Sequence, residues 1–364
     1  MPAVTPFRIL AGGPVRKRPD LLRAHLASLA AQILPPRVTL DFAFMDDNTD
    51  PASSAELWTF GDTQTHDQQR TVRLIPVQGA AQDFSDQHAI THQWSADAMI
   101  RVGEYKNRLI AQALAEGYDA LWLVDSDLIL HPRTLWSLYY AEHPIVCGVF
   151  WTRWNNTPDC PELPQVWLRH PYELDGRGLD GAEFLRKLHD HELVQVWGQG
   201  ANTLYRRAVL QKGLTFDRVP GLPTHGMWQG EDRHLCVRAE RLHIPMMADA
   251  WPVVEHCYHP EQQAAAATVT FPEEATRVSL KDEVSLQLQA LEPVPQPDGT
   301  VQALPKQHIR GQLGRVALAP EIEAVVYTLT RGEKRIVAVD YPGWSESPYR
   351  GQRRLIEVTL VDFR

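Results

Sequence analysis

The sequence has few cysteines, no excess of basic residues and no long apolar run. The four cysteines among its 364 residues are too few for a disulfide scaffold. Lysine and arginine total 36 against 45 acidic residues, which argues against a nucleic-acid or membrane-surface binder because both need a basic face. The most hydrophobic stretch, Ala120 to Leu130, contains two aspartates and is shorter than the about 18 residues of a membrane span. Since the N-terminus also lacks a secretory signal pattern, we expect a cytoplasmic protein with no membrane span and no nucleic-acid partner.

The first 260 residues alternate short apolar runs with helical patterns. Apolar runs at residues 7–11, 38–45 and 120–124 each end in a polar or glycine-rich turn, and apolar residues recur at helical spacing over 21–33 and 97–116. This alternation predicts an α/β domain with a mainly parallel central sheet. In such sheets ligands bind beyond the carboxyl ends of the strands.

The pattern changes after residue 262. Residues 263–275, in which Gln263 is followed by the alanines 264–267, are expected to be a linker. Beyond them, apolar and polar residues alternate, as in 284–288, and two apolar runs at 325–329 and 336–339 flank a turn, which predicts a hairpin. We therefore expect an α/β domain over 1–262 and a β-rich domain over 276–364.

Two aspartates follow the most apolar predicted strand. Asp125 and Asp127, separated by Ser126, come directly after Leu121-Trp122-Leu123-Val124. Neighbouring carboxylates need a cation or a shared proton, and oxygen ligands favour Mg²⁺ or Mn²⁺. A solvated turn is the alternative interpretation of this short motif.

This arrangement resembles the GT-A glycosyltransferases, whose D-x-D motif holds a metal ion on the diphosphate of a nucleotide-sugar. The resemblance covers about residues 7–260 and predicts a Rossmann-like fold. Its motifs are Ile9-Leu10-Ala11-Gly12-Gly13-Pro14-Val15-Arg16, Asp46-Asp47-Asn48, Glu104-Tyr105-Lys106-Asn107-Arg108, Leu121 to Asp127, Gly200 to Arg207, and Gly230-Glu231-Asp232.

The resemblance implies a donor site at the strand ends. Asp127 would be the principal metal ligand, and Asp125 would contact the ribose or the metal. Asp46 or Asp47 would bind the base or ribose. Residues expected to line the donor site also include Ala11, Gly12, Pro14 and Ser126, while Lys106, Arg16 or Arg18 would add positive charge beside the leaving diphosphate.

A third metal ligand is expected late in the domain. His256 is the first candidate and His259 the second. A zinc site from His256, Cys257, His259 and Cys236 is the competing interpretation, although adjacent residues of an extended segment point to opposite sides. A histidine held only by a hydrogen bond is a further alternative.

Glu231 and Asp232 precede a helical pattern. Acids in a first helical turn are favoured by the helix dipole, so a capping role is one interpretation. The resemblance to inverting enzymes instead implies that Asp232 is the base that deprotonates the acceptor hydroxyl, with Glu231 orienting a substrate. Trp197 and Trp228 could offer apolar faces to a sugar.

The C-terminal domain resembles an FKBP-type prolyl isomerase core, an α+β fold with an antiparallel sheet. The likeness rests on residues 331–335, 339–341, 355–363 and Asp298-Gly299-Thr300-Val301. The pocket residues of that family are replaced here by Leu288, Gln302, Ala303 and Ile322. We therefore expect the fold without the isomerase activity, serving acceptor binding, assembly or simply stability.

The leading hypothesis is a glycosyltransferase that uses Mn²⁺ or Mg²⁺ and a UDP- or GDP-linked sugar, and acts on a glycan, protein or small-molecule hydroxyl. A sugar nucleotidylyltransferase is the second, because Leu10-Ala11-Gly12-Gly13 resembles the phosphate-binding opening of that class. Its usual continuation is absent, and Pro14 removes one phosphate-binding N–H. A non-catalytic glycan- or peptide-binding protein is the third.

Overall fold

A computed structural model describes residues 6–35, 37–68, 70–77, 96–154, 157, 160–168, 181–189, 191–222, 230–251 and 254–271, and the strands 284–295, 301–309, 334–340 and 353–363. The chain divides into two compact units, Met1–Ala275 and Thr276–Arg364.

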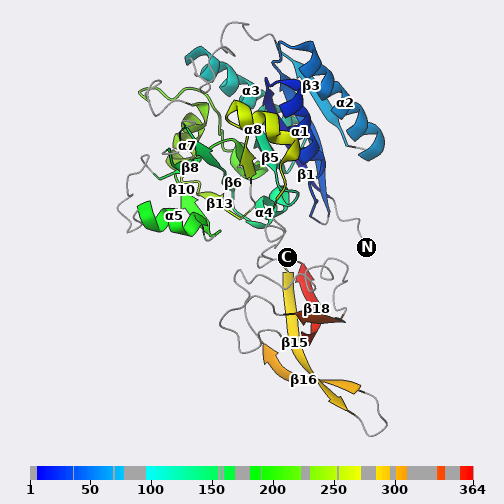
Figure 1. The fold of residues 1–364 in the computed structure, drawn as a ribbon. Helices are drawn as coiled ribbons and strands as arrows, with labels where there is room; N and C mark the ends of the chain where they lie inside the picture. Colours follow the sequence, from blue (N-terminus) through cyan, green and yellow to red (C-terminus); the bar gives the residue numbers. More distant parts are fainter. Residues whose placement is uncertain are drawn as a thin grey trace. The chain divides into compact units, whose positions relative to one another are not determined.

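An eight-stranded mixed sheet forms the centre of the first unit (Figure 1). Its order is β10-β13-β6-β12-β4-β1-β2-β3. The strands are β1 (Phe7–Val15), β2 (Val38–Asp46), β3 (Val72–Pro76), β4 (Ala120–Val124), β6 (Ile145–Gly148), β10 (Leu193–Val196), β12 (Asn202–Arg206) and β13 (Met246–Asp249). Strands β3, β2, β1 and β4 are parallel, whereas β12 runs antiparallel to both β4 and β6. The predicted α/β class with a mainly parallel sheet agrees with this structure.

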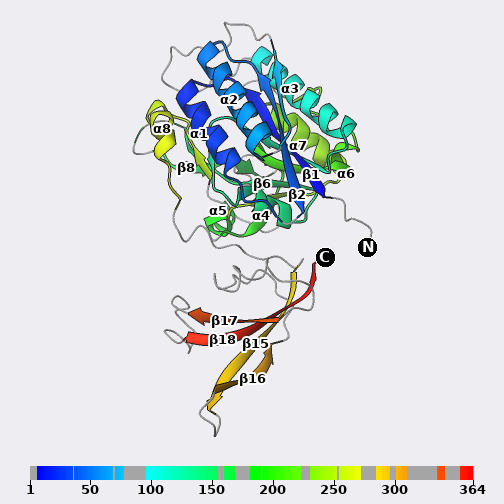
Figure 2. The same cartoon turned by 90° about the vertical axis from the view of Figure 1, so that its right-hand side faces the viewer.

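Helices cover both faces of the sheet (Figure 2). They are α1 (Pro19–Ala30), α2 (Pro51–Gln68), α3 (Ala96–Ala115), α4 (Thr134–Tyr140), α5 (Gly181–His189), α6 (Arg207–Leu210), α7 (Glu231–Arg241) and α8 (Pro260–Ala265). Short strands complete the unit: β5 (Leu128–Leu130), β7 (Trp151–Arg153), β8 (Glu162–Pro164), β9 (Val166–Trp167), β11 (Gly198–Gln199) and β14 (Val254–His256).

Two apolar cores lie on opposite faces of the sheet because successive strand residues point to opposite sides. Leu10 of β1 joins the core that contains α3, α5 and α7, while its neighbour Ile9 joins the core that contains α1, α2 and α4. The fully apolar β4 supplies both cores, with Leu121 on one side and Trp122 on the other. Burial on both faces explains why this strand is an unbroken hydrophobic run.

The structure differs from the sequence expectations at two places. The first apolar run does not end at Gly12, because β1 continues to Val15. The expected linker 263–275 is helical at its start, since α8 is followed by a 3₁₀ turn, Ala266–Thr268. Ala266 is buried in a small core with Leu21 of α1, so this segment packs on the first unit.

Gly12 occupies a position in β1 that no other residue fits. Its φ is +147°, in the region that favours glycine. A Cβ built there would lie 1.9 Å from the carbonyl oxygen of Ala43 on the adjacent strand. Gly13 is similarly close to β4, where a Cβ would lie 2.6 Å from the carbonyl oxygen of Val124. The two glycines thus allow the central strands to pack closely.

We expect Gly12→Ala to lower the free energy of unfolding by about 3 kcal/mol or more, because the methyl group meets immobile backbone and the φ is strained. The urea midpoint measures this. Gly61→Ala is the matched control, since a Cβ at this position in α2 meets only side chains at 3.6 Å or more. Alanine also favours helix, so this control should be neutral or slightly stabilising. Equal midpoints for the two variants would contradict the packing argument.

The described part of the second unit is a four-stranded antiparallel sheet of order β16-β15-β18-β17. Its strands are β15 (Val284–Pro295), β16 (Val301–Ile309), β17 (Lys334–Asp340) and β18 (Arg353–Phe363). Leu288 lies in β15, and Gln302 and Ala303 lie in β16. Residues 298–300, 322, 325–329 and 331–333 lie outside the described residues, so the hairpin and the FKBP likeness remain predictions.

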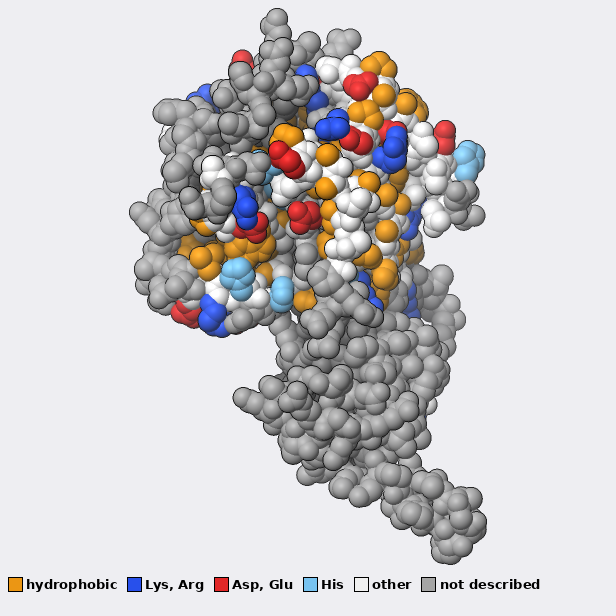
Figure 3. All heavy atoms as spheres, viewed as in Figure 1, with side chains coloured by type: hydrophobic (Ala, Val, Ile, Leu, Met, Phe, Trp, Pro, Cys, Tyr) orange, Lys and Arg blue, Asp and Glu red, His pale blue; other side chains and the backbone are white. Residues whose placement is uncertain are grey.

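Charge is mixed on the face of the first unit drawn in Figure 3, where Lys and Arg side chains stand singly among acidic ones. Within the described ranges, no helix is long and apolar enough to cross a membrane.

Candidate functional site

The candidate site lies at the carboxyl edge of the central sheet, where β1, β2 and β4 end side by side. Because β12 runs antiparallel, its beginning reaches the same edge, and Ala201 accepts a 2.7 Å hydrogen bond from the Asp125 amide. The N-terminal ends of α3 and α7 flank this edge on one face. Two clusters of charged side chains meet here.

A buried lysine organises the first cluster. The side chain of Lys106, on α3, is 2% exposed. Its Nζ lies 2.6 Å from Glu231 Oε1, 3.0 Å from Asp232 Oδ1 and 3.6 Å from Asp125 Oδ1. We call these four residues the lysine cluster. It links Asp125, at the end of β4, to the acidic pair at the start of α7.

Electrostatics in the lysine cluster are strongly perturbed. Burial alone would lower the pKa of Lys106, but three carboxylates raise it well above its ordinary value. Burial raises the pKa of Asp232 to about 7; Lys106 opposes this change, while Glu231 and Asp125 add to it. Burial also raises the pKa of Asp125. Asp232 therefore has the pKa of a base that is effective near neutral pH.

The second cluster surrounds Asp127, which is 7% exposed. Its Oδ2 lies 2.7 Å from Lys17 Nζ and 3.7 Å from His256 Nε2. The other ring nitrogen of His256 is hydrogen-bonded to Thr152 Oγ1 at 2.7 Å. The main chain fixes the arrangement, because β14 pairs with β5 and Cys257 N–H donates to the Asp127 carbonyl at 2.9 Å. We call Asp127, Lys17, His256 and Thr152 the Asp127 cluster.

Asp127 and His256 are suitable donors for one divalent cation. Ligands that each lie about 2.1 Å from an ion are roughly 3–4 Å apart, and the observed separation is 3.7 Å. Thr152 holds the imidazole from behind, as supporting groups of ligating histidines do. Among the described residues, no three His, Cys, Asp or Glu side chains form a metal-holding group. A cation here would therefore need further oxygen ligands from a substrate or water.

The acids that end β2 have other partners. Asp46 Oδ1 accepts from Asn48 Nδ2 at 2.7 Å, and Asn48 Oδ1 in turn accepts from the Lys17 amide at 3.0 Å. Asp47 is buried, with Arg16 3.7 Å away. Burial raises the pKa of Asp47, and Arg16 opposes the rise. The Asp46–Asn48 turn thus anchors the backbone of Lys17.

The remaining donor-site candidates lie along the same edge with different exposure. Ala11 and Gly12 are buried inside β1, Pro14 is partly exposed, and Ser126 is buried. Arg18 is paired with Asp20 and half exposed. None of these positions brings an exposed glycine-rich loop to the site, and the roles of these residues stay predictions.

Sequence reasoning missed Lys17 and Thr152. It considered the basic residues on either side, Arg16 and Arg18, but the side chain that reaches Asp127 is Lys17. Thr152 lies on β7, and only the folded chain brings it to His256. Lys106 was recognised, yet its contacts are with the carboxylates.

The structure does not assemble the alternative zinc site. Cys236 and Cys257 are buried in different apolar cores. His259 Nε2 is 2.6 Å from the Arg153 carbonyl oxygen, and His259 caps α8. Trp197 packs against the core that contains α7, and Trp228 lies outside the described residues.

Comparison with known proteins gives limited likenesses. No protein-family profile matches the chain, and no curated protein matches it. Among solved structures it is similar to the mannosyltransferase PcManGT from Pyrobaculum calidifontis, in complex with GDP-Man and Mn²⁺, with a TM-score of 0.37, 13% identity, and coverage of 75% of this chain and 68% of that one. A mycobacterial protein gives a TM-score of 0.35, 18% identity, and coverage of 82% and 84%. Both TM-scores are low, so neither likeness indicates the function of this chain.

Proposed function

We propose that the first unit is a divalent-cation-dependent glycosyltransferase that moves a sugar from a nucleotide-sugar to an acceptor hydroxyl. The observation that carries this proposal is the position of the two motif aspartates. Asp127 faces His256 and Lys17, whereas Asp125 faces Lys106 and the acidic pair of α7. A site for a cation and diphosphate thus adjoins a site for a base.

Charge supports the same proposal. The two clusters contain four carboxylates and two lysines. When all are ionised, the excess negative charge equals the charge of one divalent cation. Such a cation would be held by Asp127 and His256, and when bound it would stabilise the negative charge of the leaving diphosphate.

The residues of the lysine cluster have separate roles in the proposed reaction. Asp232 accepts the proton of the acceptor hydroxyl as its oxygen bonds to the anomeric carbon, while the bond from that carbon to the diphosphate oxygen breaks. The charge of Lys106 holds Asp232 beside Asp125, which keeps the base next to the donor. This single displacement inverts the anomeric configuration.

The nucleotidylyltransferase alternative receives no support from the glycines. Gly12 and Gly13 are strand residues pressed against neighbouring backbone. A phosphate-binding loop instead needs amide groups that are free of the sheet.

Calorimetry with UDP and GDP, with and without Mn²⁺, combined with hydrolysis of UDP- and GDP-sugars, tests the proposal. We expect nucleotide binding that depends on Mn²⁺ and slow release of sugar. Pyrophosphate release from a nucleoside triphosphate and a sugar phosphate would favour the nucleotidylyltransferase. Absence of nucleotide binding would favour the non-catalytic alternative.

Lys17 provides a further test of the cation site. Its ammonium group neutralises Asp127 and would compete with a divalent cation for the carboxylate. We therefore expect Lys17→Met to tighten Mn²⁺ binding in the absence of nucleotide by about tenfold, as measured by electron paramagnetic resonance. Lys212→Met, which removes an exposed lysine, is the control and should leave Mn²⁺ affinity unchanged. Weaker Mn²⁺ binding by Lys17→Met would contradict the competition.

A further inference from the structure

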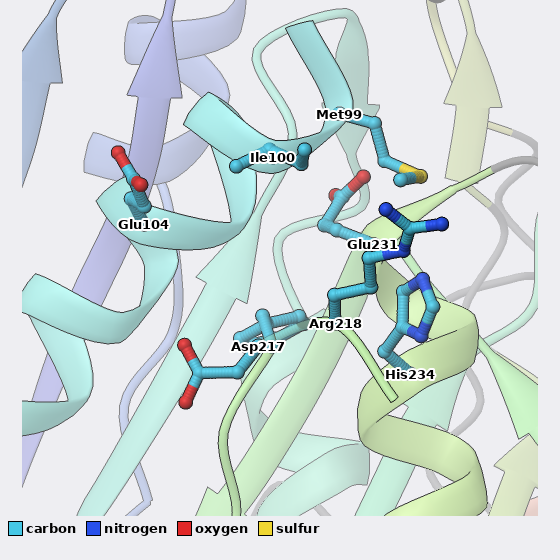
Figure 4. Close-up of a pocket in the computed structure, with 8 residues that line it drawn as sticks. Met99, Ile100, Glu104, Asp217, Arg218, Glu231 and His234 are labelled. Atoms are coloured by element: carbon cyan, nitrogen blue, oxygen red, sulfur yellow. The ribbon is translucent and has the colours of Figure 1, made fainter. Parts of the chain in front are cut away.

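A small cavity lies beside the lysine cluster, between the start of α3, the segment at residues 216–218 and the start of α7 (Figure 4). The space open to the centre of a water-sized sphere is about 70 Å³. On that measure one water needs roughly 10–15 Å³, so the cavity can hold several water molecules or one small polar group. Met99 and Phe216 supply apolar walls, and Glu231 forms part of the lining. Through Glu231, the cavity adjoins Lys106 and the base site.

A buried histidine directs a hydrogen-bond donor into this cavity. His234 is 2% exposed, and its Nδ1 accepts a 3.0 Å hydrogen bond from the Val219 amide. Burial and neighbouring arginines lower the pKa of His234, so the ring is neutral and carries its proton on Nε2. In the part of the chain that the structure describes, Nε2 makes no hydrogen bond. Nε2 is not among the buried polar atoms that lack a partner in the described residues, so it keeps contact with solvent and is open to a group bound in the cavity.

The other polar groups on this side of the cavity are also donors. Arg218 is exposed and extends over the space that His234 faces (Figure 4). Within the described residues it makes no ion pair. Helix α7 begins here, and Gly230 before it has no side chain to cap the free N–H groups of the first turn.

The described carboxylates that line the cavity do not pair with the hydrogen-bond donors of Arg218 and His234. Asp217 accepts a 2.7 Å hydrogen bond from Asn107 Nδ2 and points away from Arg218 (Figure 4). Glu104 also points away from the space that Arg218 and His234 share. Glu231 is paired with Lys106 at 2.6 Å, a cation that it shares with Asp232 and Asp125. A ligand that supplies only acceptor atoms, such as a carboxylate or a phosphate, therefore matches the donors that remain.

We propose that this cavity, the anion pocket, binds a carboxylate or phosphate group of the acceptor substrate through Arg218, the Nε2–H of His234 and the first turn of α7. The assignment to the acceptor rests on the proposed function, because it is the base site that the pocket adjoins. The transferase would thus select acceptors that carry an acidic group near the reactive hydroxyl.

Nuclear magnetic resonance of the nitrogen-15-labelled histidine side chains in the full chain tests the pocket. Inorganic phosphate and acetate are titrated separately, with chloride at matched ionic strength as the reference. We expect phosphate or acetate to shift the His234 signals in a saturable manner. If both do, the anion that binds more tightly identifies the acidic group of the acceptor. Arg218→Gln should weaken this binding by about tenfold or more, whereas Arg241→Gln, an exposed arginine at the other end of α7, should not.

Three results would overturn the proposal: His234 signals that neither anion shifts, shifts that chloride reproduces, or equal affinities in the Arg218→Gln and Arg241→Gln variants. Because Arg218 is exposed, its replacement should leave the fold intact, and the thermal midpoint verifies this. Hydrolysis of the nucleotide-sugar needs no acceptor group in the pocket. If the wild-type protein hydrolyses no nucleotide-sugar, the proposed function is refuted. If it hydrolyses the nucleotide-sugar but binds neither anion, only the pocket is refuted.

Discussion

Replacing Asp232 with asparagine is expected to lower the turnover number of sugar transfer by about 10²–10⁴-fold, the range that a general base contributes. Asparagine keeps the shape of the side chain but cannot accept the hydroxyl proton. Nucleotide affinity should change little, because Asp232 faces Lys106 rather than the Asp127 cluster. Steady-state transfer rates and calorimetry with the nucleotide separate the two effects.

The assignment of Asp232 as the base also predicts in which direction the transfer rate changes with pH. The base is active only when deprotonated, and the pKa of Asp232 is raised to about 7 by burial. The wild-type rate should therefore fall about tenfold for each pH unit below 7 and level off above about pH 8. Asp97→Asn, an exposed acid in the first turn of α3, should retain both rate and profile. A wild-type rate that is constant between about pH 5 and pH 9 would exclude Asp232 as the base.

The layered fold could be predicted because burial leaves a clear pattern in the sequence. Strand β4 is an unbroken apolar run since both of its faces are covered, and α3 matches the predicted helix because its apolar residues face one core. The antiparallel insertion of β12 between β4 and β6 could not be predicted. Four successive residues of β12 are buried. Such a pattern is compatible with either strand direction, and only long-range pairing decides its neighbours.

The acids of the candidate site could be predicted for a related reason. The ends of parallel strands meet at one edge, so Asp125 and Asp127 were expected to lie near other strand ends. The lysines that pair with these acids could not be predicted, because they are distant in sequence and no local pattern specifies which side chains meet. Lys17 reaches Asp127 across 110 positions of sequence, and Lys106 reaches Glu231 across 125. The glycines of β1 were misinterpreted. The sequence predicted a turn at Gly12, but this glycine lies within the strand, where close packing against β2 requires it.

Asp127→Ala is expected to have the largest effect on the cation site. It removes the carboxylate shared by Lys17 and His256, so Mn²⁺ should no longer increase nucleotide affinity. Transfer should fall by about 10³-fold, because the charge that develops on the leaving diphosphate would lose its counterion. Asp62→Ala is the control, since Asp62 is an exposed acid on α2, and it should behave as the wild type.

A comparison of Asp127→Ala with Asp232→Asn then separates the two halves of the site. The first should lose Mn²⁺-linked nucleotide binding, whereas the second should keep that binding and lose the chemical step. Because the lysine cluster has its own counter-charge in Lys106, removal of Asp127 should leave it in place. Metal-dependent turnover that survives Asp127→Ala would show that the cation is bound elsewhere, and the division of labour between the two clusters would have to be abandoned.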